Sequence, residues 1–518
     1  MGSSGGLDPR TPVIVGAGQV LQRPAPDGGG ALDPIGLAVA ALRIAGEDSG
    51  TGERLLRRAD SVRHVATSGW LYSDEAALVS EALGAAPRER VRSAAFGGDG
   101  PGRLVGDAAR AIAAGEADVV LIAGAEAVAS LLSVQRAGGR PSWPEQPSAR
   151  PTRVVGTERA PANEAEQAVG LLAPSLLYAL MENAIRAERG AGRDQHVARI
   201  SELWSGFSRV AARNPHAWIA REHSAREIAT PGPRNRPVAD PYTKLMSANI
   251  AVDQAAALIL CSARAAIDAG VPRERWVFPL ASAHAADEWF VSERSELAAS
   301  PAIAAASRAA LEHAGASIWE VAQIDLYSCF PSAVQIAARE LGLDIADPGR
   351  PLSVTGGLTF AGGPGNDYAL HAIATLVERL RAQPDALGLS TALGWYATKH
   401  ACGVYSASPP RRPFREIDAG ASMARPAPRA ATAAYEGPAR IESFTVPYRR
   451  DGSPEALIAS AITPDGARAL VREDEPERVA AILEADPLGA EALVVAGAGG
   501  RIELGAPATL AAGAQLGA

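Results

Sequence analysis

GGDGPGRLVGDAARAIAAGEADVVLIAGAEA (residues 97–127) contains one complete supersecondary unit. A glycine-rich turn leads into a predicted helix over residues 104–114, a Gly-Glu pair ends that helix, and an almost wholly apolar run follows at 118–123. An apolar run bounded by turns is typical of a strand buried on both faces, as in a sheet that helices cover on each side. The stretch therefore predicts an α/β fold.

The same order of features returns in the second half of the chain. Gly363-Pro364-Gly365 precedes a predicted helix, and the apolar strand LGLSTAL follows at residues 387–393. In the first half, Gly100-Pro101-Gly102 stands in a similar relation to the strand at 118–123. Two such units in one chain indicate an internal duplication, with two βαβ-type halves packed together.

Changes in composition divide the chain further. Residues 131–250 are rich in Pro, Arg, Trp and Asn, which indicates a domain inserted into the first half. A Pro- and Arg-rich linker follows the second half, and the alternating strands after it have the Asp-Gly and Gly-Gly turns of a small β-rich, OB-like domain. The predicted boundaries are 1–265 for the first half with its insertion at about 131–250, 266–407 for the second half, 408–438 for the linker and 439–518 for the β-rich domain.

The overall composition argues against several classes of function. The 518 residues are 47% hydrophobic and 21% charged, which fits a soluble globular protein of two or three domains. A formal net charge of −8 argues against nonspecific binding to nucleic acid or anionic membranes, and no apolar run approaches the roughly 18 residues of a membrane span. Three widely spaced cysteines predict neither a disulfide framework nor a metal site. The N-terminus has no basic segment before an apolar core, so we expect a cytoplasmic protein.

Several segments, taken in order, resemble the thiolase superfamily over residues 10–407, and within it the sterol-carrier-type thiolases and thiolase-like proteins. The segments that carry the resemblance are TPVIVGAG at 11–18, DVVLIAGAEA at 118–127, NIAVDQAAALIL at 249–260, YSCF at 327–330, the paired glycines that lead to Gly363-Pro364, and LGWYATKHACGVY at 393–405. The resemblance implies a layered α-β-α-β-α core of two βαβαβαββ halves with an inserted loop domain. It also implies CoA thioester substrates, with CoA as part of the substrate and no separate cofactor.

The chain departs from the family's pattern at each catalytic position. The nucleophilic cysteine of the family falls at Asp99, the histidine that activates it falls at Gly363, and the second cysteine falls near Leu393. A carboxylate cannot replace a thiolate as acyl carrier without forming a reactive mixed anhydride. We therefore expect no thiolysis through an acyl-cysteine.

Two residues remain as candidate catalytic groups. Tyr327 occupies the family position that holds Asn or His, where its hydroxyl can donate a hydrogen bond or act as an acid/base; the alternative is a buried tyrosine bonded to backbone. His400 lies near the former second cysteine and is either a replacement base or a packed histidine. The candidate substrate-binding residues are Asp99, Gly363, Asn366 and Lys244; no metal ligand is predicted.

Other residues have a structural interpretation. Cys329 and His371 are predicted to pack, and Asn366 and Asp367 to cap the following helix. Of the 50 basic residues, only Lys244 and Lys399 are lysine, which distinguishes these two positions.

The resemblance also bears on ligand and partner. Family members contact the CoA phosphates through arginines of the loop domain, a role that Arg136, Arg140, Arg150, Arg153, Arg221, Arg234 and Arg236 can share here, beside Trp143, Trp204 and Trp218. The β-rich domain resembles the extra domain of monomeric type 1 thiolase-like proteins. Thiolase-like aldolases that lack the cysteine use tyrosines and an OB-fold partner. Tyr327 stands where one of those tyrosines lies, but the position of the second is Gly363 here, so the match is half complete.

Three functions stay open from the sequence. The first is acyltransferase-like chemistry on a CoA thioester without an acyl-cysteine. The second is a retro-aldol reaction on a β-hydroxyacyl-CoA, with Tyr327 as acid/base. The third is non-catalytic binding of CoA or acyl-CoA, with the β-rich domain contacting a protein partner. The chain is expected to be a monomer if that domain covers the family's dimer face, and a homodimer otherwise.

Overall fold

The first sheet of the core consists mostly of buried strands. In the computed structural model, which describes residues 7–24, 30–146, 148–495 and 500–505, six strands pair in the order β1-β8-β4-β2-β3-β5. The run at 118–123, predicted to be buried, forms most of β4 near the centre of this sheet, and both β4 and its neighbour β8 are buried at every residue. The strands are β1 (Pro12–Gln22), β2 (Ser61–His64), β3 (Glu89–Ser93), β4 (Val119–Ala127), β5 (Arg153–Val155) and β8 (Asp253–Ser262).

The second sheet repeats the pairing pattern of the first. Its order is β10-β11-β12-β9-β13, with β10 (Val321–Asp325), β11 (Leu387–Gly394), β12 (Lys399–Ser406), β9 (Phe278–Ala286) and β13 (Arg415–Asp418). β10 and β11 are parallel, and β11–β12 and β12–β9 are antiparallel. In the first sheet β2 and β4 are parallel, and β4–β8 and β8–β1 are antiparallel. The predicted duplication is confirmed.

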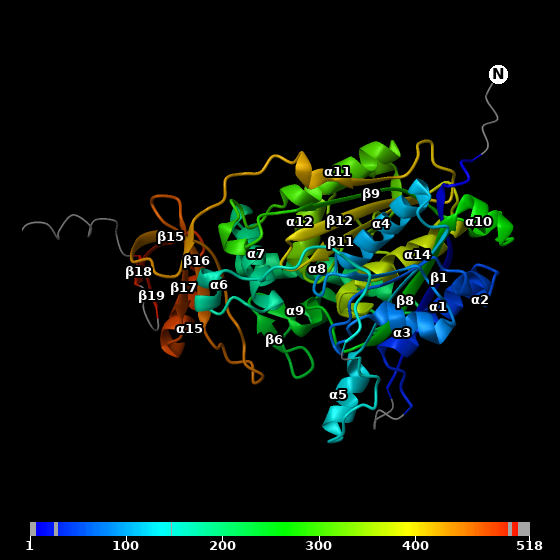
Figure 1. The fold of residues 1–518 in the computed structure, drawn as a ribbon. Coiled ribbons are helices and arrows are strands. Elements are labelled where there is room, and N and C mark those ends of the chain that lie inside the picture. The colour runs from blue at the N-terminus through cyan, green and yellow to red at the C-terminus, as the bar shows by residue number, and fades with distance from the viewer. Residues whose placement is uncertain (1–6, 25–29, 147, 496–499, 506–518) are drawn as a thin grey trace, which may run out of the picture.

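Helices separate and cover the two sheets, which gives the five layers that the resemblance implied (Figure 1). α4 (Gly100–Ala114) and α14 (Tyr368–Ala382) contact both sheets and each other, so they form the central layer. Their apolar side chains, such as Leu104 and Leu370, share one buried cluster with both sheets. α1 (Pro34–Asp48) and α3 (Glu75–Leu83) cover the first sheet on its outer face, and α11 (Pro301–Ala314) with α12 (Pro331–Leu341) lies outside the second.

The segment between β4 and β8 forms the predicted insertion. Its helices are α5 (Val128–Arg136), α6 (Glu164–Ala168), α7 (Pro174–Glu188), α8 (Arg193–Ala211) and α9 (Ala225–Ala229), followed by the small hairpin β6 (Pro237–Ala239) and β7 (Tyr242–Thr243). The chain breaks between α6 and α7, because Gly170 adopts a positive φ of 75° and Pro174 begins the second helix. Figure 1 shows α5 projecting from the body of the molecule.

The C-terminal region forms a third sheet with one helix. Six strands pair in the order β14-β17-β16-β15-β18-β19, and α15 (Pro476–Ala485) packs beside them. The predicted linker contributes β13 to the core and β14 to this sheet, so it is more ordered than its composition suggested. The strands are β14 (Ala431–Thr432), β15 (Gly437–Thr445), β16 (Leu457–Ile462), β17 (Arg468–Glu473), β18 (Glu491–Val495) and β19 (Arg501–Leu504).

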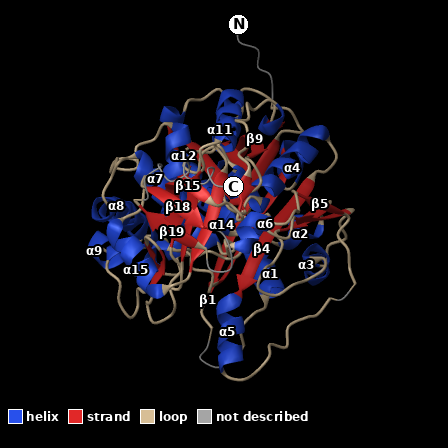
Figure 2. Cartoon of the chain, turned by 90° about the vertical axis from the view of Figure 1, so that its left-hand side faces the viewer, coloured by secondary structure: helices blue, strands red, loops and turns tan. Residues whose placement is uncertain are grey.

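This C-terminal sheet docks on the insertion at one end of the molecule (Figures 1 and 2). Asn183 of α7 donates to the carbonyl of Phe444 at 2.9 Å, and Arg186 forms a paired hydrogen bond with Asp486 at 2.6 and 2.7 Å. The remaining short helices are α2 (Glu53–Arg57), α10 (Ala263–Asp268) and α13 (Gly357–Phe360). Within the described ranges, the helices are all too short or too polar to cross a bilayer.

Candidate active site

Asp99 lies where the central helix α4 begins. It occupies the N-cap position, its side chain makes no capping hydrogen bond, and only 5% of the residue is exposed. The partial positive charge of a helix N-terminus favours a carboxylate there. The position near which the sequence resemblance expected a nucleophilic cysteine therefore holds a buried carboxylate at the start of a core helix.

Lys399 neutralises this carboxylate. Its Nζ lies 3.1 Å from Asp99 Oδ1 and donates to the carbonyl oxygens of Phe96 at 2.8 Å and Thr157 at 3.4 Å. Glycines make room for the pair, because a Cβ at Gly97 or at Gly394 would lie 2.3 or 2.0 Å from Asp99 Oδ1. A buried ion pair thus takes the place of a sulfur nucleophile.

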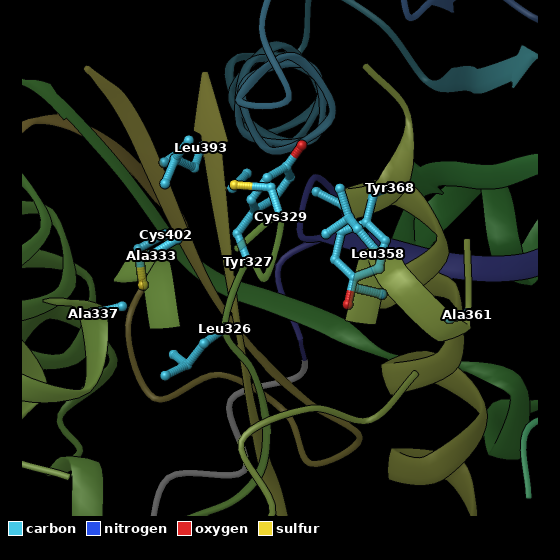
Figure 3. Packing of buried hydrophobic residues seen from close by; sticks show 14 of the residues in the cluster. Leu326, Tyr327, Cys329, Ala333, Ala337, Leu358, Ala361, Tyr368, Leu393 and Cys402 are labelled. Atoms are coloured by element: carbon cyan, nitrogen blue, oxygen red, sulfur yellow. The ribbon is translucent and has the colours of Figure 1, made fainter. Parts of the chain in front are cut away.

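The hydroxyl of Tyr327 reaches the backbone beside Asp99. A Cβ on Gly98 would lie 2.2 Å from the Tyr327 hydroxyl oxygen, so the two are in close contact. The Tyr327 ring packs edge-on against Tyr368 at 5.4 Å, and both lie in the buried cluster of Figure 3. Burial, followed by the nearby Cys329 and Asp99, raises the pKa of Tyr327 well above its usual value. The hydroxyl therefore stays protonated and is able to donate a hydrogen bond.

Asn366 ties three loops together around this point. Its Oδ1 accepts from the Gly97 N–H at 2.8 Å, and its Nδ2 donates to the carbonyls of Ala66 at 2.8 Å and Ala95 at 3.0 Å. Every polar atom of the side chain has a protein partner, which is the arrangement of a residue that positions loops. The predicted capping role is wrong for Asn366. Asp367 occupies the N-cap position of α14 as predicted, but its side chain makes no capping hydrogen bond.

Gly363 is not required by the backbone. Its φ lies outside the left-handed region, and an added Cβ would make ordinary contacts of 3.4 Å with Leu358 and the Asn249 carbonyl. Its N–H donates to that carbonyl at 2.9 Å. A side chain is therefore sterically possible here, and the missing family histidine is not explained by strain.

His400 and Lys244 lie apart from the ion pair. His400 follows Lys399 on β12 and points to the other face of the sheet, where its Nε2 lies 3.2 Å from Asp287 Oδ2. With Tyr327 it lines a cavity of about 10 Å³, which is enough for a single water molecule. Lys244 is exposed in the short 3₁₀ turn Lys244–Met246.

Comparison with known proteins places this core in a family. A monomeric SCP2-thiolase-like protein type 1 from Mycobacterium smegmatis, known from its crystal structure, is 33% identical, with 96% of this chain and 100% of that chain covered and a TM-score of 0.82. The chain belongs to the SCP2-thiolase-like protein type 1 family. Residues 421–497 also match the family model for the additional C-terminal domain of thiolase-like protein type 1.

A second comparison shows the same core fold at greater distance. The Ltp2-ChsH2(DUF35) aldolase is 20% identical, with 77% of this chain and 99% of that chain covered and a TM-score of 0.59. The search of curated proteins gave no match. The duplicated thiolase-like core is thus shared with an aldolase complex, while the C-terminal domain assigns the chain to the type 1 thiolase-like proteins.

This type 1 thiolase-like protein offers no reactive thiol. Its three cysteines, Cys261, Cys329 and Cys402, are buried and free. Burial raises the pKa of Cys329 and of Cys402 to about 12 and raises the pKa of Cys261 further. The thiolate is the nucleophile, so none of these groups is activated for acyl transfer. The packing predicted for Cys329 agrees with its burial.

A buried polar cluster beside the Gly-Gly-Pro-Gly turn was not anticipated from the sequence. Glu126 accepts from the Ser68 N–H and hydroxyl, both at 2.6 Å, and burial raises its pKa and, more strongly, the pKa of Asp367. His371 Nδ1 lies 2.9 Å from Gln19 Oε1, and burial lowers its pKa to about 3. His371 is a neutral, packed residue, as the sequence indicated.

The arginines and acidic groups of the insertion are partly used within the chain. Arg153 pairs with Asp107 at 2.7 Å, and Arg221 pairs with Glu227 at 3.4 Å. Among the described residues, acidic, histidine and cysteine side chains form no group of three suited to a metal ion.

The sequence singled out Lys399 only through the rarity of lysine, and its partner Asp99 only through the missing cysteine.

Proposed function

We propose that this chain binds a CoA thioester and carries out acyltransferase-like chemistry by direct transfer, without a covalent acyl-enzyme. The observation that carries the proposal is the buried pair of Asp99 and Lys399 at the start of α4, in place of a nucleophilic thiol. Membership of the thiolase-like family supports a thioester ligand, and the absence of an activated cysteine supports a one-step transfer.

Two groups are suited to polarise a thioester carbonyl at this position. The first is the protonated hydroxyl of Tyr327, which lies against Gly98. The second is the N-terminus of α4, which begins at Gly100. Donors of this kind stabilise the negative charge that develops on a carbonyl oxygen during acyl transfer. The Lys399 ammonium compensates the Asp99 carboxylate, so that carboxylate does not oppose the developing charge.

Tyr327 gives the decisive test because Tyr368 provides a matched control. Acyl-CoA substrates with a panel of small acceptors are assayed for release of free CoA thiol, and the intact protein mass is followed in parallel. We expect Tyr327→Phe to reduce CoA release at least about tenfold, the cost of one hydrogen bond to a charged oxygen. Tyr368→Phe should reduce it less, because the Tyr368 hydroxyl is bonded to Thr355 at 2.6 Å. An acylated protein mass, or equal rates in both variants, would contradict the proposal.

A retro-aldol reaction on a β-hydroxyacyl-CoA is the second candidate. A protonated tyrosine beside a carboxylate, as Tyr327 lies near Asp99, is a combination that can transfer protons in carbon–carbon cleavage. Release of a ketone or aldehyde from such substrates, abolished in Tyr327→Phe, would favour it. Binding of acyl-CoA without turnover of any substrate would instead identify a non-catalytic binding protein.

A further inference from the structure

An open cleft reaches the Asp99–Lys399 pair from the side of the segment that follows β13. Its volume is about 410 Å³, within the range of small-molecule sites. α4 contributes Asp99 and Arg103, and the ends of β9 and β12 contribute His284 and Lys399. Residues of the predicted linker, among them Asp418 and Arg425, form one further wall, and Gly156 and Thr157 of the insertion also line the cleft.

The wall of the cleft is fixed by strand pairing. β13 pairs in parallel with β9, and Asp418 lies opposite His284 in this register. The Asp418 side chain then accepts from the Gly420 N–H at 3.0 Å, which turns the chain over the cleft. The segment that connects the core to the C-terminal domain thereby closes one side of the cleft.

Arg103 is the main cation without a partner in this cleft. Among the described residues, its guanidinium has neither an ion pair nor a hydrogen bond, and its buried Nε lacks an acceptor. It lies one turn after Asp99 on α4, whose carboxylate is already engaged by Lys399. Arg425, on the opposite wall, is also without an ion pair to any described residue. A planar guanidinium fork with free donors is suited to bind a carboxylate.

The other charged groups set the sign and size of the preferred ligand charge. Asp418 is exposed at the rim, and His284 is neutral because burial and then Arg103 lower its pKa to about 4. Glu416 lies on the same strand as Asp418, 3.9 Å from Arg110, and burial raises its pKa while the nearby Arg103 lowers it. Among the lining residues, Arg103, Arg425 and Lys399 against Asp99 and Asp418 leave one positive charge, which Glu416 near Arg103 partly offsets. That balance favours a monoanion over a phosphate dianion.

We propose that this cleft is a binding site for a small organic monocarboxylate, held by Arg103 and Arg425 above the Asp99–Lys399 pair. Arg103 and Arg425 are not among the groups proposed above to polarise the thioester carbonyl, so carboxylate binding and CoA release are tested separately. Its occupant would lie directly outside the ion pair at the start of α4.

Calorimetric titration of the full-length protein tests the proposal. The probes are sodium butyrate and sodium hexanoate, with butanamide as the neutral analogue and inorganic phosphate as the competing oxyanion. We expect the carboxylates to bind and butanamide not to bind. Arg103→Gln should weaken carboxylate binding about tenfold or more, the loss expected for hydrogen bonds to a charged group. Arg425→Gln, at an exposed residue, should weaken it less.

Arg110→Gln is the matched control, because Arg110 lies on the same helix but is paired with Glu116 at 3.0 Å. We expect it to change the affinity less than twofold, and unfolding temperatures will show that all variants fold. Three results would each overturn the assignment: no carboxylate binding at 10 mM ligand, equal binding in Arg103→Gln and wild type, or binding of phosphate alone. A dissociation constant of 10 mM corresponds to roughly 2.7 kcal/mol of binding free energy.

Discussion

Replacing Lys399 with methionine tests whether the contact between Lys399 and Asp99 is a buried ion pair or a surface contact. The side chains of Lys399 and Asp99 are only 6% and 7% exposed, so solvent screens their 3.1 Å contact little. Removing one partner of a buried pair leaves an uncompensated charge, which costs about 3–5 kcal/mol of unfolding free energy. The Phe96 carbonyl also loses its donor at 2.8 Å.

Thermal unfolding of the full-length protein measures this loss. For a core of roughly 400 residues, an unfolding entropy of about 2.1 cal/mol/K per residue makes 1 kcal/mol worth about 1.2 °C. Lys399→Met should therefore lower the unfolding temperature by about 4–6 °C. Scans at one fixed rate are needed, because a chain of several domains need not unfold in two states.

The double variant shows whether the charge itself is responsible. Asp99→Asn combined with Lys399→Met removes both charges, and we expect at least half of the lost stability to return. A loss below about 1 °C in Lys399→Met, or a double variant as unstable as the sum of the single variants, would refute the reasoning.

Three further predictions concern the site and its surroundings. The wild type should show no thiolysis of acetoacetyl-CoA above background in an absorbance assay. Asp99→Cys should not create this activity, because Gly363 supplies no base. Wild-type thiolysis that is abolished by Asp99→Ala would contradict the prediction. Burial lowers the pKa of His371 from its usual 6.5 to about 3. Neutral His371 therefore contributes to the free energy of unfolding above about pH 6.5, and this contribution is at most about 5 kcal/mol. The contribution is lost as the pH falls toward 3. His371→Gln should therefore reduce the acid sensitivity of the unfolding temperature in that window, and an unchanged profile would disprove it. Asn366→Ala should cost about 2–4 kcal/mol because it leaves the Gly97 N–H and two buried carbonyls without partners; a calorimetric loss under 1 kcal/mol would show that water replaces the amide.

The layered core was predictable because its central strands are recognisable as apolar runs in the sequence. β4 and β8 contain the apolar runs Val119–Ala125 and Ala255–Cys261, and such runs occur where helices cover both faces of a sheet. The repeated Gly-Pro-Gly turns marked the two halves before their strand pairing was known. The order of the linker was missed, since Pro- and Arg-rich composition conceals the short strand β13.

The site was predictable only in part. Sequence placed Asp99 and Tyr327 at family positions, and both lie beside Gly98. The opposite directions of Lys399 and His400 follow from strand alternation, a signal that was present but requires the strand boundary to be known. The pairing of Lys399 with Asp99 joins residues 300 positions apart, and no local pattern reports such a contact.

The central claim is that the site accepts a CoA thioester although it has no sulfur nucleophile. Calorimetric titration of acetyl-CoA into the full-length protein, followed by intact mass measurement of the same sample, tests it most directly. The account predicts saturable binding with a protein mass that does not change. The absence of binding heat for acetyl-CoA and longer acyl-CoAs, or an added acyl mass on the protein, would contradict it.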